Sequence, residues 1–357
     1  MKVINYWRIF PRNTRVQVFQ DLQSKMEILI VTEADVSIGL GHLRRCIILA
    51  KEALNHDVDV TFYLIHSNIE AQNFLESKGF KLSEFTSIEE ALTAKAYGAV
   101  VVDIRNDVAI SDEANLLLGK QNVALIDDIS ERNNYAKYSF YTPAGDVGQY
   151  AKFGKSLEIY GGWNYLISNQ DFKLDNQKKI NELLINFGAS DPFFLSEAIL
   201  HKFGKYLEKY DCTLVLGPLV DKNRKGSISE LGTQTGCKII WNPTDFSEIV
   251  SASKLVIGTF GNLFYESILA GTPIISIYKN ISEVKSLITD NYLQDLYFFD
   301  KSIFDIGSKP LESAYFTEAI EQTFLRIKQG YEFKFRNLDT SKGEMRIIEK
   351  ILSEVTT

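Results

Sequence analysis

Short apolar runs alternate with longer amphipathic segments along most of this 357-residue chain. In the first half, the runs EILIVT, DVTFYLI, GAVVVDI and NVALIDD are short and rich in β-branched residues, which is typical of buried strands. Apolar residues between Leu43 and Leu54 recur at helical spacing, so residues 42 to 55 are predicted to form a helix that lies on a sheet. Strands that alternate with helices indicate a parallel α/β layer.

The alternation weakens over residues 133 to 178, which we expect to connect two domains, and it then restarts with INELLINF, CTLVLG, CKIIW, KLVIG and TPIISIY. A chain of this length suits two domains. We therefore predict two Rossmann-like α/β domains that face each other across a cleft, where the carboxyl ends of their strands meet. The expected segments are an N-terminal extension at 1–25, an N-terminal domain at 26–165 on the sugar-binding and catalytic side, a linker at 166–178, a UDP-binding C-terminal domain at 179–340 and a C-terminal helix at 341–357. Two helical segments, at about 315–329 and 342–355, close the chain, and one of them could cross back to the first domain.

The net charge of −7 disfavours nucleic acid or an anionic membrane as the main partner, because both attract basic surfaces. No stretch approaches the ~18 uninterrupted apolar residues of a membrane span, and residues 1–25 lack the pattern of a secretory signal. A cytoplasmic protein is expected. Cys46, Cys212 and Cys237 are widely spaced and form no CxxC pair, which favours free buried thiols over a disulfide or zinc site.

The stretch VSIGLGHLRRC follows the first predicted strand and opens the first predicted helix. Gly39 and Gly41 suit a tight strand-to-helix loop, and His42 is then either a structural residue, a phosphate contact or a general base. The spacing departs from the dinucleotide fingerprint, and no acidic residue ends the second strand, so NAD binding is disfavoured.

The turn INFGASDP, at residues 185 to 192, ends a predicted strand and begins a helix. Gly188 and Ser190 allow a phosphate to approach this turn, and helix capping by Ser190 or Asp191 is the structural alternative.

A second turn of this kind lies in VIGTFGNLFYESILAGTPIISI, at residues 256 to 277. A pyrophosphate could bind where the helix begins near Asn262, and a carboxylate one turn further, Glu266, could accept both ribose hydroxyls. The alternative is that Glu266 is a solvated helix residue. The predicted binding residues of this turn are Gly258, Thr259, Gly261, Asn262 and Glu266.

Carboxylates end two further predicted strands, at Asp103 and at the pair Asp127 and Asp128. At a cleft such groups can orient a base or a sugar hydroxyl, or they can cap the next segment. No histidine or third carboxylate stands at a metal-ligand spacing near the pair, so we expect neither a metal nor another cofactor.

Taken together, EADVSIGLGHLRRCIILAKEAL, VVVDI, LIDDIS, INFGASDP and SASKLVIGTFGNLFYESILAGTPIISI resemble the UDP-sugar hydrolases of pseudaminic acid biosynthesis and their relatives in spore-coat polysaccharide synthesis. These proteins are similar in turn to the peptidoglycan N-acetylglucosaminyltransferase. The resemblance covers residues 26 to 280 in order, and it implies the glycosyltransferase-B fold.

The resemblance also implies an activity: water attacks the anomeric carbon of a UDP-linked diacetamido-trideoxy sugar, and UDP leaves. His42 would be the base or would position the water, and Glu266 would bind the ribose. Gly258, Thr259 and Gly261, with the turn from Gly188 to Ser190, would face the pyrophosphate. Sugar-side contacts are expected from Gly39, Gly41, Arg45 and Asp103.

The sequence departs from this family where His-Tyr commonly follows the VVVD strand, since Ile104 and Arg105 stand there, and Phe260 and Phe264 add bulk beside the expected phosphates. The prediction is therefore a UDP-sugar hydrolase of nonulosonic-acid or surface-polysaccharide biosynthesis. One alternative is a glycosyltransferase that gives the sugar to an acceptor, and another is a non-catalytic protein that binds a nucleotide sugar.

Overall fold

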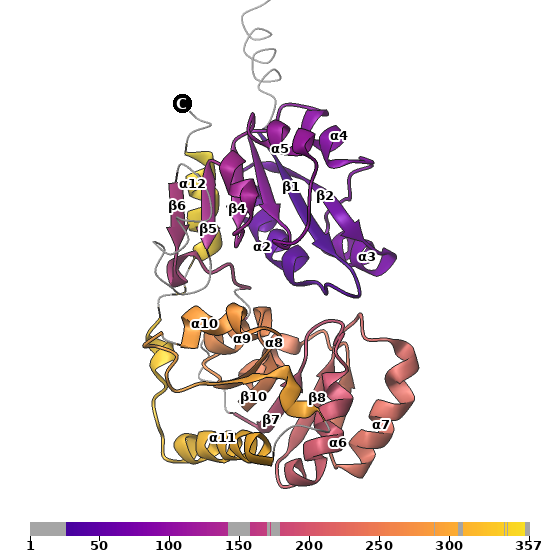
Figure 1. Cartoon of the computed structure of the whole chain (residues 1–357), viewed down its shortest axis with the longest axis vertical. Coiled ribbons are helices and arrows are strands. Elements are labelled where there is room, and N and C mark those ends of the chain that lie inside the picture. The colour runs from indigo at the N-terminus through magenta and orange to yellow at the C-terminus, as the bar shows by residue number, and fades with distance from the viewer. Residues whose placement is uncertain are drawn as a thin grey trace, which may run out of the picture.

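The structure is a computed structural model, and it describes residues 26–141, 158–169, 172, 179–288, 290–305, 310–338, 340 and 342–353. The predicted extension at 1–25 lies outside the described residues, as does most of the expected linker. The described chain forms two α/β units, one above the other in Figure 1.

The N-terminal unit is a six-stranded sheet with the order β2-β1-β3-β4-β5-β6, and every neighbouring pair is parallel. Its strands are β1 (Glu27–Ala34), β2 (Asp59–Ser67), β3 (Ala99–Asp103), β4 (Val123–Ile126), β5 (Tyr138–Tyr141) and β6 (Glu158–Gly161). Its crossover helices are α2 (Gly41–Asn55), α3 (Ile69–Ser77), α4 (Ile88–Thr93) and α5 (Asp112–Leu118). The first strand lies inside the sheet and is almost wholly buried, which explains its continuous apolar run.

The region from 133 to 178 is not only a connection, contrary to the prediction. Two of its segments, β5 and β6, extend the N-terminal sheet. Aromatic side chains stabilise this edge: the rings of Phe140 and Tyr160 are stacked with their centroids 5.4 Å apart. Tyrosine is a good strand residue despite its polar hydroxyl, which is why a polar-looking stretch forms strands here.

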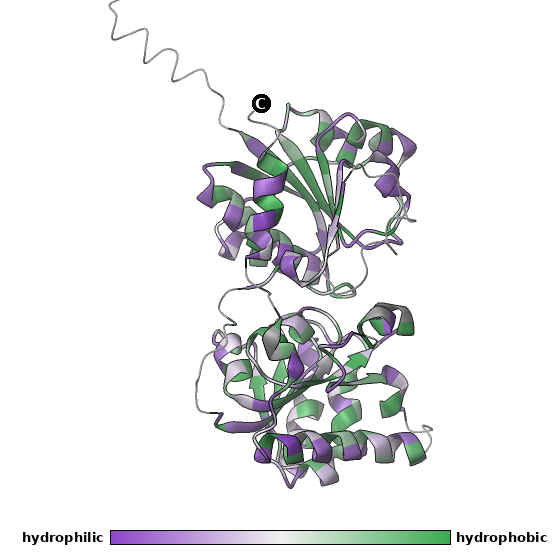
Figure 2. Cartoon of the chain, turned by 90° about the vertical axis from the view of Figure 1, so that its left-hand side faces the viewer, coloured by the Kyte–Doolittle hydropathy of each residue, from purple (hydrophilic) through white to green (hydrophobic). Residues whose placement is uncertain are grey.

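The C-terminal unit repeats the design, with a parallel sheet in the order β12-β11-β10-β7-β8-β9. Its strands are β7 (Asn181–Asn186), β8 (Cys212–Leu216), β9 (Lys238–Trp241), β10 (Ser253–Thr259), β11 (Ile274–Tyr278) and β12 (Tyr297–Asp300). Its helices are α6 (Leu195–Leu207), α7 (Lys225–Gln234), α8 (Phe246–Ser251), α9 (Asn262–Leu269), α10 (Ile281–Ile288) and α11 (Pro310–Lys328). Hydrophobic residues concentrate on the strands of both sheets, while the helices also carry hydrophilic residues (Figure 2).

The last described helix, α12 (Gly343–Leu352), returns to the N-terminal unit. It lies near β5 and β6 in Figure 1, whereas α11 lies at the far side of the C-terminal unit. Ile347, Ile348 and Ile351 are buried in the same apolar core as α2. The approach is close, because a Cβ added at Gly343 would lie 2.2 Å from the carbonyl oxygen of Leu166.

The two units also touch directly between the sheets. Ala189 and Leu219 of the C-terminal unit pack into the core cluster of the N-terminal unit. The side-chain amide of Asn262, at the start of α9, donates a hydrogen bond of 3.2 Å to the carbonyl oxygen of Gly41, at the start of α2. The amino ends of two helices, one from each unit, therefore meet at the interface. Among the described residues, no helix combines the length and apolar character needed to cross a membrane.

Candidate active site

A cavity of about 850 Å³ lies between the two units, where the carboxyl ends of the strands face each other. We call its lining residues between 38 and 141 the N-terminal wall, and those between 186 and 280 the C-terminal wall. The structure brings ten of the predicted site residues to this cavity: Gly39, Gly41, His42, Arg45, Gly188, Ser190, Thr259, Gly261, Asn262 and Glu266.

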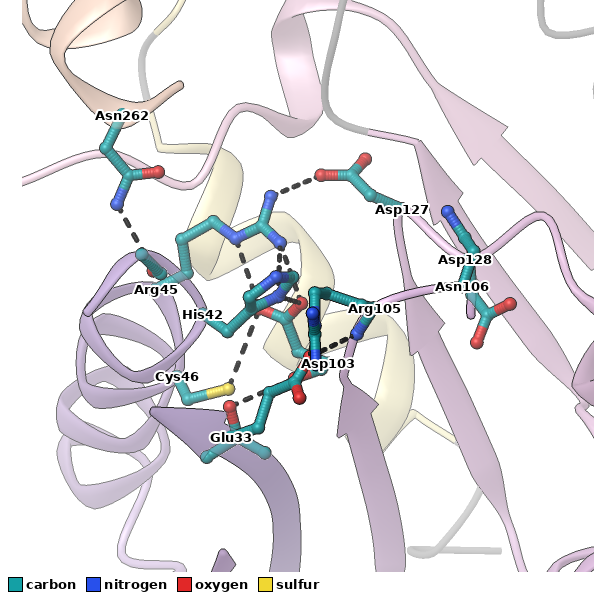
Figure 3. Close-up of polar contacts among 12 residues, drawn as sticks. Glu33, His42, Arg45, Cys46, Asp103, Arg105, Asn106, Asp127, Asp128 and Asn262 are labelled. Carbon is teal, nitrogen blue, oxygen red and sulfur yellow. Dashed lines mark hydrogen bonds and ion pairs between the residues drawn. The ribbon is translucent and has the colours of Figure 1, made fainter. Parts of the chain in front are cut away.

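His42 sits in the first turn of α2, and its ring is held by Asp103, the last residue of β3 (Figure 3). The ring nitrogen Nδ1 lies 2.7 Å from Oδ1 of Asp103. A carboxylate can only accept, so this contact assigns the proton to Nδ1 and leaves the lone pair on Nε2. The histidine side chain is 23% exposed and lines the cavity, whereas Asp103 is fully buried behind it. This is the geometry of a base with an orienting carboxylate.

Arg45 lies one helical turn after His42 and binds the same carboxylate, with one terminal nitrogen 3.3 Å from Nδ1 of the His42 ring. Its Nε and one terminal nitrogen donate to Asp103 over 3.1 Å and 2.7 Å, and its other terminal nitrogen pairs with Asp127. The two-point contact fixes the plane of the Asp103 carboxylate and with it the position of the His42 ring. Arg45 also lines the cavity, so it is both a support of His42 and a wall residue.

The charges in this cluster are strongly coupled. Burial alone would raise the pKa of Asp103, but Arg45 and His42 outweigh it and hold that pKa below its usual range. Burial would lower the pKa of Arg45, and Asp103 and Asp127 instead raise it. Asp103 and Arg45 are therefore both ionised at neutral pH and form a fixed ion pair behind the His42 ring.

The C-terminal wall presents turns and helix starts. Gly188 follows β7 with a φ of +88°, and Gly261 precedes α9 with a φ of +143°, a backbone region that favours glycine. The residue before α9 makes no side-chain cap, so the helix begins with its first N–H groups facing this end of the cavity. Such a helix start is suited to an anion.

Glu266 lies in the second turn of α9 and lines the cavity. No hydrogen bond or ion pair to its carboxylate is found among the described residues. Burial raises its pKa, and the charge of Arg44 opposes that shift only in part. A half-buried carboxylate with unused acceptor atoms is suited to a ligand that brings hydroxyl donors.

Two predicted residues do not reach the cavity. Asp103 is buried under His42, contacts its ring, and does not line the cavity. Gly258 is not a lining residue, because it is packed against α9: a Cβ there would lie 2.4 Å from Cδ2 of Leu263 and 2.7 Å from the carbonyl oxygen of Asn186. Close packing therefore requires a glycine at this position.

The two phenylalanines near the expected phosphates have different roles. Phe264 is fully buried and belongs to the core of the C-terminal unit. Phe260 lines the cavity, and its ring packs against Phe264 and Tyr265 with centroid distances of 5.2 Å and 6.0 Å. The bulk of Phe260 therefore narrows the cavity beside α9.

Sequence reasoning missed Glu33, near the end of β1. Its carboxylate is fully buried and binds the backbone and side chain of Arg105, which lines the cavity. An acidic residue inside an apolar strand run was the available signal, because a buried acid needs a partner. Asp128 was noticed as one of a pair, and it instead forms a buried ion pair with Arg132 at 2.6 Å.

The three cysteines are buried side chains outside the cavity lining. Cys46, Cys212 and Cys237 are free and buried. Burial raises the pKa of the Cys46 thiol, next to Asp103. Within the described ranges, no group of three or more histidine, cysteine, aspartate or glutamate residues is placed to hold a metal ion.

Comparison with solved structures gives matches over nearly the whole chain. MurG from Acinetobacter baumannii has a TM-score of 0.61 at 12% identity, over 92% of this chain and 99% of that one. The UDP-GlcNAc 2-epimerase from Neisseria meningitidis bound to UDP-GlcNAc has a TM-score of 0.58 at 14% identity, over 92% and 100%. Anabaena HepE in complex with UDP-glucose has a TM-score of 0.53 at 13% identity, over 93% and 98%. The chain has the glycosyltransferase-B fold.

Comparison by sequence alone also gives a relative. No protein-family model matches the chain. The uncharacterised protein MJ1062 of Methanocaldococcus jannaschii is 24% identical over 327 residues, which cover 85% of this chain and 64% of that protein. The chain thus spans less than two thirds of the length of this relative. The description of this relative names no activity.

Proposed function

We propose that this protein is an enzyme that binds a UDP-sugar in the cavity between its units and breaks the bond between the anomeric carbon and UDP. The observation that carries the proposal is the position of His42. Its Nε2, left as the acceptor by the Asp103 contact, belongs to one wall of a cavity whose opposite wall holds helix α9 and Glu266. A base and an anion-binding helix start thus share one site.

The cavity gives the substrate an orientation. The uridine diphosphate binds the C-terminal wall, with its phosphates at the turns of Gly188 and Gly261 and its ribose hydroxyls on Glu266. The glycosyl group then lies toward His42. HepE has been solved in complex with UDP and with UDP-glucose, and the Neisseria epimerase bound to UDP-GlcNAc; these proteins share the fold, which supports the assignment of the nucleotide.

In the proposed reaction, Nε2 of His42 accepts a proton from a water molecule, and the water oxygen forms a bond to the anomeric carbon. The bond from that carbon to the diphosphate oxygen breaks, and its electron pair leaves with UDP. The carboxylate of Asp103 stabilises the imidazolium that forms, while the amino end of α9 stabilises the negative charge on the leaving diphosphate. The products are the free sugar and UDP.

The finer assignment, hydrolysis of a UDP-linked amino or deoxy sugar in nonulosonic-acid or surface-polysaccharide biosynthesis, rests on the sequence resemblance described above. Transfer to an acceptor is the second candidate, and one observation favours it. A neighbouring cavity of about 690 Å³ shares Arg45, Asn262 and Glu266 with the first and offers room for an acceptor. Water and an alcohol would use the same base.

A panel of UDP-amino sugars tests the proposal. The protein is incubated with each compound, and the anomeric proton signals and released UDP are followed by NMR. Free sugar formed without an added acceptor supports hydrolysis, whereas UDP release that requires an acceptor supports transfer. For the variant His42→Ala, the matched control is His56→Ala. His56 lies just past the other end of α2, and among the described residues its ring forms an ion pair only with Glu52, at 3.3 Å. UDP binding without any turnover would contradict the catalytic proposal and support a binding protein.

A further inference from the structure

The loop that follows Asp103 places an arginine, Arg105, at the cavity, and buried groups fix the position of this residue. Arg105 lines the N-terminal wall, and its side chain is 43% exposed. Its backbone N–H and its Nε both donate to Oε1 of Glu33, over 2.6 Å and 3.1 Å, and Glu33 is fully buried (Figure 3). Main chain and side chain of one residue are thus fixed by the same carboxylate.

A second buried charged residue, Arg132, also binds this loop. Arg132 donates to the carbonyl oxygens of Arg105 and Val108, over 2.9 Å and 2.5 Å, and it is itself paired with buried Asp128. Asn106 adds a third contact by accepting the N–H of Ile129 at 2.7 Å. So many contacts to one short loop predict a preorganised wall.

The Arg105 side chain cannot leave Glu33 at low cost. Arg105 is the ionic partner of Glu33 found in the described part of the chain, and the second oxygen of Glu33, Oε2, is buried with no hydrogen-bond partner there. Moving the guanidinium away would leave the buried Glu33 carboxylate without its ionic partner, which would raise the free energy of the folded protein. The position of Arg105 is therefore fixed by the protein and not by the ligand.

The charge of Arg105 is already balanced by acids. Glu33 lies 3.1 Å from its Nε, and Asp107, on the same loop, lies 3.8 Å from it. No partner is found among the described residues for its two terminal nitrogens, which remain donors at the cavity wall. The guanidinium thus offers hydrogen bonds without a net positive field, which suits an uncharged oxygen better than a carboxylate.

On this basis, and resting on the function proposed above, we propose that Arg105 is a specificity-determining residue that donates to an uncharged oxygen, a hydroxyl or an acyl carbonyl, of the glycosyl group. Glu33 is its positioning residue. The pair selects UDP-sugars with neutral substituents and disfavours sugars with a carboxylate at the same place.

UDP-glucose and UDP-glucuronic acid test this selection, because they differ only in oxidation of one carbon. The affinities of UDP, UDP-glucose, UDP-GlcNAc and UDP-glucuronic acid are measured by calorimetry, together with UDP release where it occurs. We expect UDP-glucose or UDP-GlcNAc to bind at least tenfold more tightly than UDP-glucuronic acid. Equal or tighter binding of the glucuronic acid compound would overturn the proposal.

Variants separate a direct contact from a structural effect. Arg105→Gln should weaken the neutral UDP-sugars roughly 10- to 100-fold, the range expected for lost hydrogen bonds from a charged donor, while the affinity for UDP alone stays unchanged. Arg105→Lys should recover part of the loss. Glu33→Gln removes a compensating negative charge, so it should reduce the discrimination against UDP-glucuronic acid. Arg326→Gln, on α11 at the far side of the C-terminal unit, is the matched control.

The two proposals fail in different ways. If the wild-type protein binds none of the four compounds, the proposed function is contradicted, and the role of Arg105 falls with it. If UDP binds as expected and Arg105→Gln retains wild-type affinity for the neutral sugars, only the role of Arg105 is contradicted. If Arg105→Gln weakens the binding of UDP and of the UDP-sugars equally, the melting temperature of the variant decides the cause. A lowered melting temperature indicates a disturbed fold, and an unchanged one contradicts a contact specific to the glycosyl group.

Discussion

The two walls of the cavity are built by different means. The N-terminal wall depends on side chains: His42, Arg45 and Arg105 are each fixed by a carboxylate that lies at or near the end of a strand. The C-terminal wall depends on backbone, with glycines in the left-handed region and an open helix start. Proton transfer needs a side chain of fixed tautomer, whereas a diphosphate can be bound by N–H groups alone.

This contrast predicts a kinetic division. Changes in the N-terminal wall should lower turnover and leave UDP affinity intact. Changes in the C-terminal wall should lower UDP affinity and leave turnover intact. The largest effect is expected for His42→Ala. Loss of a general base should reduce kcat on the order of 10²- to 10⁴-fold, with the dissociation constant of UDP within about twofold of wild type, as kinetics and calorimetry would measure. A weakened UDP complex with preserved kcat would reverse the division.

Asp103→Asn should produce the next largest effect. Asparagine can present its amide N–H₂ to the ring, which would favour the wrong tautomer of His42, and it removes one of the two carboxylates that pair with Arg45. We expect a kcat loss of at least about 10²-fold and, because a buried ion pair is broken, a destabilisation of about 3 kcal/mol. Urea unfolding monitored by fluorescence gives the second value.

The pH dependence of this variant provides a further check. The fold lowers the pKa of Asp103, so the ionised carboxylate stabilises the native state above its unfolded value of 3.8, and this contribution is lost as the pH falls below 3.8 toward the folded pKa. Asp103→Asn should therefore lose stability less steeply than the wild type in that acidic range. Parallel curves for the two proteins would mean that Asp103 does not carry the expected charge.

Glu266→Gln probes the opposite wall. If Glu266 binds the ribose, the variant should weaken UDP binding roughly 10-fold or more through the loss of charge-assisted hydrogen bonds, with kcat at saturating substrate little changed.

In the free protein, Glu266→Gln should stabilise the fold at neutral pH. Burial raises the pKa of Glu266, so the fold favours its protonated form, and stability is lost as the pH rises above 4.5. Glutamine removes that loss, and thermal unfolding of the two proteins should converge near pH 4.

The smallest effect is expected at the contact between the walls. Asn262→Ala removes the hydrogen bond of 3.2 Å to the carbonyl oxygen of Gly41. A single such bond is worth about 1 kcal/mol, so we expect a change of only about fivefold in kcat/KM for the UDP-sugar. Asn223→Ala, in the turn before α7 and outside the cavity, is the control. A loss comparable with that of His42→Ala would show that Asn262 belongs to the chemistry itself.

The alternation of apolar runs was enough to predict two parallel α/β units, because buried parallel strands must be apolar on both faces. It did not reveal β6 and β12, which are edge strands with incomplete burial, or β5, which is buried but is built from tyrosine, serine and phenylalanine rather than from an aliphatic run. Nor did it decide which unit α12 joins. An amphipathic pattern shows that one face of a helix is buried, but not which surface covers it.

The sequence also predicted some, but not all, of the residues at the candidate site. The position of His42 at a strand-to-helix loop placed it on the cleft, and the structure puts it there. Gly258 does not line the cavity, and its close packing against Leu263 gives a second reason for a glycine there. Sequence alone does not separate a glycine required by a neighbouring side chain from one that faces a phosphate. Arg105 was noted only as a departure from a family pattern, because its partner Glu33 lies 72 residues away in the chain.

The return of α12 has a consequence for how the protein is made. Asn122, just before β4, donates its side-chain amide to the carbonyl oxygen of Ile351, 229 residues later, at 3.5 Å. On the ribosome, the N-terminal unit therefore emerges with an open apolar face on α2, which stays uncovered until the whole C-terminal unit has been synthesised. Of the two units, the one that is translated earlier is therefore completed later, and its apolar face is open to aggregation until α12 has been made.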